Sequence, residues 1–190
     1  TDINNLTDRF KAVEMLNQFF EKKHIEGELK EEKDFKILNI DLKVYLNKLT
    51  EADDTFISKY IDEVSRYLES VHEISISKLW PVDRMKYYFV KQKDVTKLLD
   101  LLRLQQSGEL KKCKLIKKNG HYYINYPYKD LVPESYLLID DNLKVKRRTV
   151  KSQWEDMTLK IKGYCFIEKI DIPRKKDVTM EFFLCNEETD

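Results

Sequence analysis

The chain has 190 residues, 42% of them hydrophobic and 36% charged, with a formal net charge of +1. This composition is typical of a globular chain that buries a core, and no apolar run approaches the ~20 residues of a membrane-spanning helix. Cysteines are few and widely spaced (Cys113, Cys165 and Cys185), which argues against a disulfide framework and favours a reducing compartment.

The small net charge hides an uneven distribution along the chain. Residues 1–107 carry 18 basic and 20 acidic residues, and residues 152–190 carry 6 basic and 9 acidic residues. Residues 108–151 carry 11 basic and 5 acidic residues, a balance of +6. Attraction for an anionic partner is therefore expected to be local to this middle segment.

Residues 1–107 are predicted to form a helical linker domain, a bundle of about five helices. Apolar residues recur at spacings of three and four, as in Phe10, Val13, Leu16 and Phe20. Residues typical of helix starts and ends occur between these apolar repeats. In chain order they are Thr7, Asp34, Asp53, Pro81, Asp94 and Gly108.

Residues 108–151 are predicted to form a small antiparallel β subdomain. Two β-prone runs flank Asn119–Gly120, a pair that suits the tight turn of a hairpin because both residues tolerate positive φ. A second hairpin is expected from "SYLLID" and "LKVKRRTVK", joined by a turn at Asp141–Asn142.

Residues 152–190 are predicted to begin a further β module. Leu159, Ile161, Gly163, Cys165 and Ile167 alternate along one face of a strand, and the run "VTMEFFLC" follows as a second strand. Cys165 is expected to be a small buried hydrophobe. Two strands cannot close an immunoglobulin-like sandwich, which needs about seven, so they either pack on the preceding sheet or belong to a domain that continues elsewhere.

No catalytic residue or metal site is predicted, and no cofactor is expected in this segment. The four glycines lie too far apart for a phosphate-binding loop, and the three histidines are isolated in the sequence. Cys113 and His121 lie on opposing strands of the first predicted hairpin, so a metal pair is conceivable, but no further Cys or His neighbours them to complete a four-ligand site. Asp140–Asp141 is better explained by turn formation than by metal binding.

One group of residues suggests a binding surface. Tyrosines and basic residues share the middle segment, and aromatic rings can stack on sugars or bases while cations pair with phosphates. Such a surface could bind a sugar-phosphate polymer or single-stranded nucleic acid. The residues expected to bind the polymer are Tyr122 and Tyr126 for stacking or hydroxyl contacts and Arg147, Arg148 and Lys151 for phosphates. The alternative is that tyrosine favours strands and lysine protects exposed strand edges, with no ligand involved.

The order of these segments resembles a known family. The stretch "LWPVDRMKYYFVKQKDVTKLLDLL", the Lys- and Tyr-rich hairpin and the pattern "W-x4-L-x-I-x-GYCFIEKID" resemble the region after the catalytic domain of family 2 glycosyltransferases of Gram-positive wall teichoic acid synthesis. The last pattern, which begins at Trp154, also resembles the immunoglobulin-like module of those enzymes and of CDP-glycerol glycerophosphotransferases. The chain is then expected to be part of a longer parent.

The resemblance implies an α+β fold, with an N-terminal helical bundle followed by antiparallel β hairpins and the first strands of an immunoglobulin-like β domain. It implies a non-catalytic accessory region that braces the catalytic domain of the same parent chain and contributes to binding of an anionic sugar-phosphate polymer, to homo-oligomerisation, or to both. The parent would use a nucleotide sugar and a divalent metal. The implied location is cytoplasmic, with peripheral association at the inner face of the membrane as an open alternative.

The alternative hypothesis is that the chain is a nucleic-acid-binding module that uses the same Tyr- and Lys-rich surface. The modest charge of the middle segment and the lack of the Lys/Arg-Gly-aromatic motif of RNA-binding sheets weigh against it, and DNA is not an expected partner.

Overall fold

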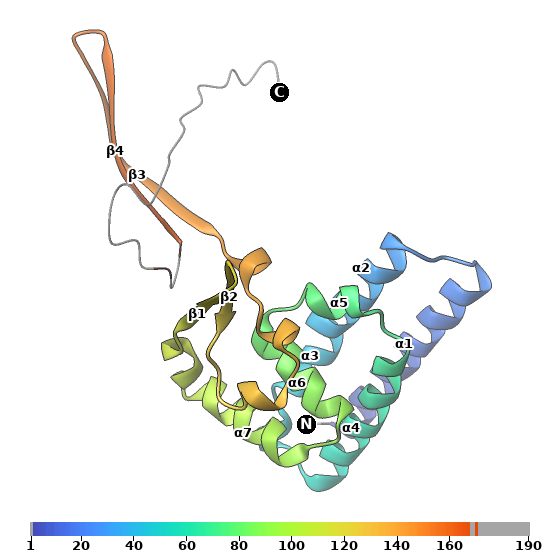
Figure 1. The fold of residues 1–190 in the computed structure, drawn as a ribbon. Coiled ribbons are helices and arrows are strands. Elements are labelled where there is room, and N and C mark those ends of the chain that lie inside the picture. Colours follow the sequence, from blue (N-terminus) through green and yellow to red (C-terminus); the bar gives the residue numbers. More distant parts are fainter. Residues whose placement is uncertain (1, 168–169, 171–190) are drawn as a thin grey trace. The chain divides into compact units, whose positions relative to one another are not determined.

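The computed structural model describes residues 2–167 and residue 170. The fold is α+β, as predicted, with helices in the first part of the chain and two antiparallel hairpins after them (Figure 1). The chain separates into two compact units, Thr1–Asn142 and Leu143–Asp190. Among the described residues, the helices lack the combination of length and apolar character that a bilayer span requires.

The first unit is built mainly from helices. The α-helices are α1 (Ile3–Lys22), α2 (Glu28–Lys36), α3 (Lys43–Leu46), α4 (Asp54–Glu69), α5 (Glu73–Ser77), α6 (Pro81–Lys91) and α7 (Val95–Gln106). A π-helix at Ile37–Leu42 joins α2 to α3. Short 3₁₀ turns occur at Leu49–Glu51, Glu109–Lys112, Lys129–Leu131, Glu134–Leu137 and Asp140–Asn142.

Several helix boundaries are those that the sequence predicts. The carboxylates of Asp53 and Asp94 accept hydrogen bonds from Phe56 N at 2.8 Å and Lys97 N at 3.1 Å, and so cap α4 and α7. Pro81 occupies the first turn of α6, where its missing amide donor costs nothing. Gly108 follows α7 with a φ of 80°, which glycine adopts without a Cβ penalty.

Two predicted caps are wrong. The cap of α1 is Asp2, whose carboxylate accepts from Asn4 N at 2.8 Å, whereas the Thr7 hydroxyl donates within the helix to Ile3 O. Asp34 lies inside α2 and is 1% exposed. Its carboxylate accepts a hydrogen bond from Tyr67 Oη at 2.7 Å, so a distant partner, and not the local backbone, uses this side chain.

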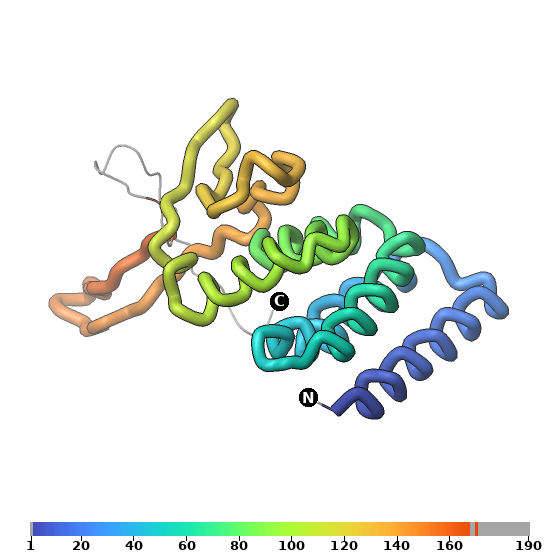
Figure 2. Tube along the Cα trace, turned by 90° about the horizontal axis from the view of Figure 1, so that it is seen from below, coloured from blue at the N-terminus to red at the C-terminus, as the bar shows by residue number. Residues whose placement is uncertain are grey.

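The core of the first unit lies where α4 meets its neighbours. Figure 2 shows α4 between α1 and α6, and α6 also contacts α7. Apolar side chains from each of these helices are buried there, and Phe56, Val64, Met85, Phe89 and Leu101 are among them. Burial of each such side chain contributes about 1.5–3 kcal/mol before conformational entropy is subtracted.

The first hairpin is confirmed. Strands β1 (Leu115–Lys118) and β2 (His121–Ile124) pair antiparallel around Asn119–Gly120, both of which have positive φ. The segment that follows lies along β2, because Ile139 N donates to Tyr122 O at 3.0 Å. The hairpin therefore belongs to the same compact unit as the helices.

The guanidinium of Arg84 on α6 holds that following segment from the helical side. It donates to the carbonyls of Ser77, Leu79, Ser135 and Leu138 and to the side chain of Asn142. Arg84 is 3% exposed, and burial lowers the pKa of its guanidinium. Five acceptors on separate turns thus converge on one planar donor group, which suits the fork geometry of arginine.

The predicted second hairpin is wrong. Residues of "SYLLID" form a 3₁₀ turn and a single bridge, Tyr123 to Leu138, in place of a strand. The following strand, β3 (Val145–Glu155), pairs instead with β4 (Thr158–Ile167) through a tight turn at Asp156–Met157. The expected boundary between residues 151 and 152 therefore falls inside β3, and the expected boundary at 107 lies within the first unit.

Side chains on β3 and β4 are exposed throughout much of their length. Trp154, which precedes the predicted strand of residues 159–167, is 71% exposed. Cys165 is likewise exposed, against the expectation of a small buried residue. The predicted strand "VTMEFFLC" lies outside the described residues.

Candidate functional site

The five residues predicted to bind a polymer are divided between the two units. Tyr122 and Tyr126 lie in the first unit, and Arg147, Arg148 and Lys151 lie on β3 in the second. Tyr126 is 5% exposed, and burial raises its pKa to about 12. Its ring packs within the protein and is not presented for stacking, so Tyr126 is not part of the candidate site.

Tyr122 is half-buried on β2, and its ring is engaged by a neighbour. The ammonium of Lys117 lies 5.3 Å from the ring centroid, an intramolecular cation–π contact across the first hairpin. Tyr122 therefore already has a cationic partner. The remaining predicted residues, Arg147, Arg148 and Lys151, all lie on β3.

The register of β3 and β4 sorts their side chains onto two faces. Residues directly opposite each other in an antiparallel pair project to the same side. Arg148 is opposite Tyr164, Lys151 is opposite Lys162, and Lys160 is opposite Gln153 on one face. We call this the cationic face and define it as Arg148, Lys151, Lys160, Lys162, Tyr164 and Phe166.

Arg147 lies on the other face. It is opposite Cys165, and this face also carries Trp154, Leu159 and Ile161, all of them exposed. The β3–β4 hairpin is therefore two-sided, with cations and aromatic rings on one side and mainly apolar residues on the other. Of the three predicted basic residues, the structure brings Arg148 and Lys151 together and separates Arg147 from them.

An irregularity in the ladder decides this grouping. The pairing steps from Thr149–Gly163 to Lys151–Lys162, which leaves Val150 as an extra residue on β3. With uninterrupted pairing, Lys151 would be opposite Ile161 on the apolar side. The extra residue reverses the alternation of β3 and aligns Lys151 with Arg148.

Gly163 makes this irregularity possible. A Cβ at this position would lie 2.6 Å from the Arg148 carbonyl oxygen and 3.3 Å from the Thr149 Cα. Both are backbone atoms, which cannot move aside as a flexible side chain can. The glycine is thus explained by the close approach of the opposite strand.

The cationic face carries an excess of positive charge. Lys160 pairs with Glu155, the one acidic residue on this side among residues 145–167. In the described part of the chain, no ion pair is formed by Arg148, Lys151 or Lys162. Two aromatic rings adjoin these cations: Tyr164 and Phe166 are exposed, with centroids 6.1 Å apart and an interplanar angle of 32°.

Lys160, Lys162, Tyr164 and Phe166 were not among the predicted site residues. Their alternation along β4 was visible in the sequence. What the sequence did not reveal was the pairing partner of β4, since β3 was assigned to a different hairpin. Without knowledge of that pairing, the residues of β3 and β4 were assigned to two different predicted domains, although they form one surface.

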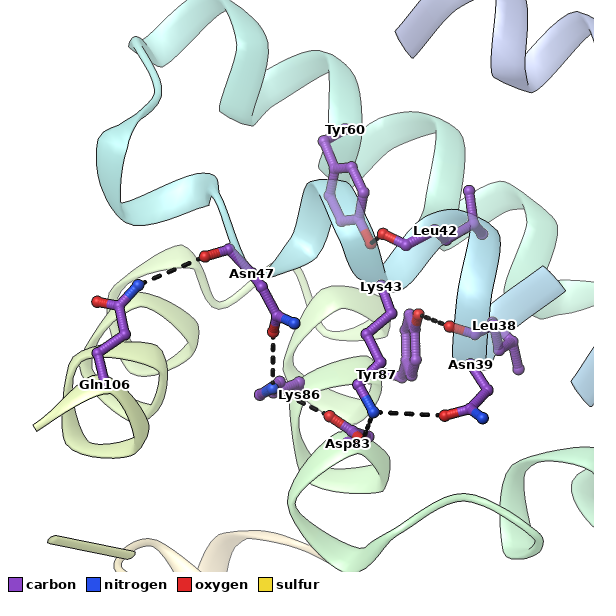
Figure 3. Close-up of polar contacts among 10 residues, drawn as sticks. All are labelled: Leu38, Asn39, Leu42, Lys43, Asn47, Tyr60, Asp83, Lys86, Tyr87 and Gln106. Atoms are coloured by element: carbon purple, nitrogen blue, oxygen red, sulfur yellow. Dashed lines mark hydrogen bonds and ion pairs between the residues drawn. The ribbon is translucent and has the colours of Figure 1, made fainter. Parts of the chain in front are cut away.

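A second polar cluster lies inside the first unit (Figure 3). The carboxylate of Asp83 on α6 accepts from Lys86 Nζ at 2.9 Å and pairs with Lys43 Nζ at 2.6 Å. Lys86 also donates to Asn47 Oδ1 at 3.1 Å, and Lys43 to Asn39 Oδ1 at 3.3 Å. Burial lowers the pKa of the Lys86 ammonium, while Asp83 beside it acts in the opposite direction.

Two tyrosine hydroxyls complete this cluster at the π-helix. Tyr60 Oη donates to Leu42 O at 3.1 Å, and Tyr87 Oη donates to Leu38 O. Both hydroxyls therefore bond carbonyls of the segment in which the regular hydrogen-bonding pattern of the α-helix is interrupted. Burial raises the pKa of both phenols well above their ordinary value.

The arrangement of this buried cluster indicates a structural role. The Lys86 side chain is 0% exposed and that of Asp83 is 2% exposed, so neither group is presented to a ligand. Among the described residues, no group of three or more His, Cys, Asp or Glu side chains is placed to hold a metal ion. The cationic face of the hairpin is therefore the candidate site.

His121 and Asp140 also have a structural explanation. The Asp140 carboxylate lies 2.6 Å from His121 Nδ1 and accepts from Tyr122 N at 2.7 Å. The hydrogen bond from the Tyr122 backbone and that with His121 lower the pKa of Asp140. This carboxylate thus joins the turn at Asp140–Asn142 to β2, whereas the turn interpretation had expected it to bond the local backbone of the turn.

No family model, curated protein or solved structure matches the chain.

Proposed function

We propose that this chain is a non-catalytic accessory region that binds an anionic sugar-phosphate polymer through the cationic face of the β3–β4 hairpin. One observation carries the proposal. The irregularity at Val150 places Lys151 opposite Lys162 and beside Arg148, next to the exposed rings of Tyr164 and Phe166. Polymers that alternate phosphates with hydroxylated carbon units present complementary groups to such a surface.

The geometry favours an extended ligand over a small molecule. Residues on one face of a strand recur about every 7 Å, so the cations and rings form a row along the hairpin. Their exposure means that each contact is weak, because water and salt compete for it. Several weak contacts along a repeating polymer would still raise its local concentration near an attached enzyme.

The parent that best fits this role is a wall teichoic acid glycosyltransferase. The order of helices, hairpin and strand pattern supports this assignment, and the first unit would then brace the catalytic domain of the same chain. β3 and β4 would be the first strands of an immunoglobulin-like module. The nucleotide sugar and divalent metal would be held by that catalytic domain, on the cytoplasmic side of the membrane.

The proposal is tested by a matched pair of variants on one strand. Arg148→Ala and Arg147→Ala remove the same charge from adjacent residues, but only the former changes the cationic face. We expect Arg148→Ala to weaken binding of poly(glycerol phosphate) or poly(ribitol phosphate) several-fold, and Arg148→Ala with Lys151→Ala to weaken it about tenfold, which corresponds to about 1.4 kcal/mol. Arg147→Ala should change the affinity less than about twofold.

Titration calorimetry at low and at physiological salt measures both effects. Affinity for the polymer should fall as salt rises, because the contacts are exposed charges. Equal losses for Arg147→Ala and Arg148→Ala would show that total charge, and not the cationic face, governs binding. Stronger retention of a single-stranded oligonucleotide than of either polymer would favour the nucleic-acid alternative.

A further inference from the structure

The two lysines at the centre of the cationic face form an unfavourable pair. Lys151 and Lys162 are directly opposite each other across β3 and β4. Like charges in directly opposed cross-strand positions destabilise the pairing. Arg148 occupies a neighbouring position on the same face and adds to this repulsion, whereas the charge of Lys160 is paired with that of Glu155.

Among the described residues, the hairpin shows few contacts that would offset this repulsion. Within residues 145–167, β3 and β4 form a two-stranded sheet, and their side chains are mostly exposed. An isolated two-stranded hairpin is marginally stable in water even without repulsive pairs. The irregularity at Val150 also interrupts the ladder at this point, which removes further hydrogen bonding.

We infer that an anionic phosphate group bridging Lys151 and Lys162 stabilises the folded hairpin, so that ligand binding and hairpin order are coupled. This inference rests on the proposed function and adds to it a dependence of the hairpin fold on its ligand. A phosphate group carries several acceptor oxygens, so it can contact both ammonium groups and the Arg148 guanidinium at once. A ligand that binds the folded state and not the unfolded one raises the stability of the former by mass action.

The coupling is measurable by hydrogen exchange on the full chain. Sodium tripolyphosphate is the probe, and sodium chloride at matched ionic strength is the comparison. We expect tripolyphosphate to slow exchange in peptides spanning residues 145–167 and to leave peptides from α4 and α6 unchanged. Equal slowing by sodium chloride would overturn the inference, because general screening would then account for the effect.

Substitution of Lys151 should raise hydrogen-exchange protection of the hairpin without anion and reduce the further protection that tripolyphosphate gives. Lys151→Gln removes the like-charge pair, so the hairpin without anion should gain protection by about 1.5- to 5-fold. The same variant should lose most of its response to tripolyphosphate. Lys151→Glu, which creates an opposite-charge pair with Lys162, should exceed Lys151→Gln in protection without anion.

The matched control is Lys91→Gln at the end of α6, which removes one exposed lysine from the first unit. It should behave like the unmodified chain in both conditions. If Lys151→Gln instead lowers protection without anion, or keeps the full response to tripolyphosphate, the inference is wrong.

The same measurement separates this inference from the proposed function. Binding of poly(glycerol phosphate) without slower exchange in residues 145–167 would refute the coupling and leave polymer binding intact. Slower exchange with tripolyphosphate, together with no binding of either teichoic acid polymer, would support the coupling and refute the proposed ligand.

Discussion

Asp83 shows how one buried residue can organise several helices. Its carboxylate is shared by Lys86 from its own helix and Lys43 from α3, and the partners of these lysines include Asn47 and Asn39. A buried ammonium without a counterion is costly because its hydration is lost. The stability of the first unit should therefore depend strongly on this one carboxylate.

Substitution of Asp83 tests that dependence. Asp83→Asn keeps the shape but removes the negative charge, so we expect the free energy of unfolding to fall by about 3 kcal/mol. Chemical denaturation followed by circular dichroism measures the change. Asp62→Asn is the matched control, because Asp62 pairs with Lys93 on the surface, where an ion pair contributes about 0–1 kcal/mol. Similar losses for the two variants would contradict the role assigned to Asp83.

Single residues also explain where sequence reasoning about caps failed. Asp53 and Asp34 both precede apolar stripes, and an aspartate before such a stripe predicts a cap. The prediction holds for Asp53, whose carboxylate accepts from the local backbone. It fails for Asp34, because Tyr67, far away in the sequence, supplies the hydrogen bond instead.

Among the elements, the β3–β4 hairpin shows most clearly how local geometry sets a surface. Its alternation alone would place Lys151 with Arg147 and away from Arg148. The extra residue at Val150 reverses this, and Gly163 permits the close backbone approach on the opposite strand. The composition of the cationic face therefore depends on one inserted residue and one glycine.

Replacing that glycine should disrupt the hairpin locally. In Gly163→Ala the new Cβ would meet the Arg148 carbonyl at 2.6 Å, so the strands must separate or shift register. We expect faster hydrogen exchange in residues 145–167 and weaker polymer binding, with exchange in α4 unchanged. Thr149→Ala, which changes the residue opposite Gly163 without adding atoms, is the control and should retain most protection. Unchanged exchange in Gly163→Ala would show that the close approach is not required.

At the scale of the whole molecule, the two units differ in how they are stabilised. Among the residues that the structure describes, the buried apolar side chains all lie between Leu6 and Ile139, within the first unit. Helices, the first hairpin and the segment tied by Arg84 share that core. The described part of the second unit, by contrast, has mainly exposed side chains.

This difference predicts that the first unit folds alone. A fragment of residues 1–142 contains every buried apolar residue in the described part of the chain, so its free energy of unfolding should lie within about 0.5 kcal/mol of that of the same unit in the full chain. Denaturant unfolding of both proteins, followed by the far-ultraviolet signal of the helices, makes the comparison. A fragment that lacks cooperative unfolding would show that residues after 142 contribute to the core.

The sequence by itself determined the features that depend on neighbouring residues. The α+β class, the caps at Asp53 and Asp94, the start at Pro81 and the Asn119–Gly120 turn follow from short-range periodicity and backbone preference. The basic character of the middle segment was also visible, as was the alternation along residues 158–167.

Only the tertiary structure decided which distant groups meet. In the structure β3 pairs with β4, and Arg147 lies on the opposite face from Arg148. Tyr126 is buried, and the carboxylate of Asp34 accepts a hydrogen bond from the Tyr67 hydroxyl. Strand pairing, burial and long-range hydrogen bonds depend on contacts between residues far apart in the chain. Local sequence patterns do not predict such contacts. The cationic face is a product of such contacts, and for that reason four of its six residues were not predicted.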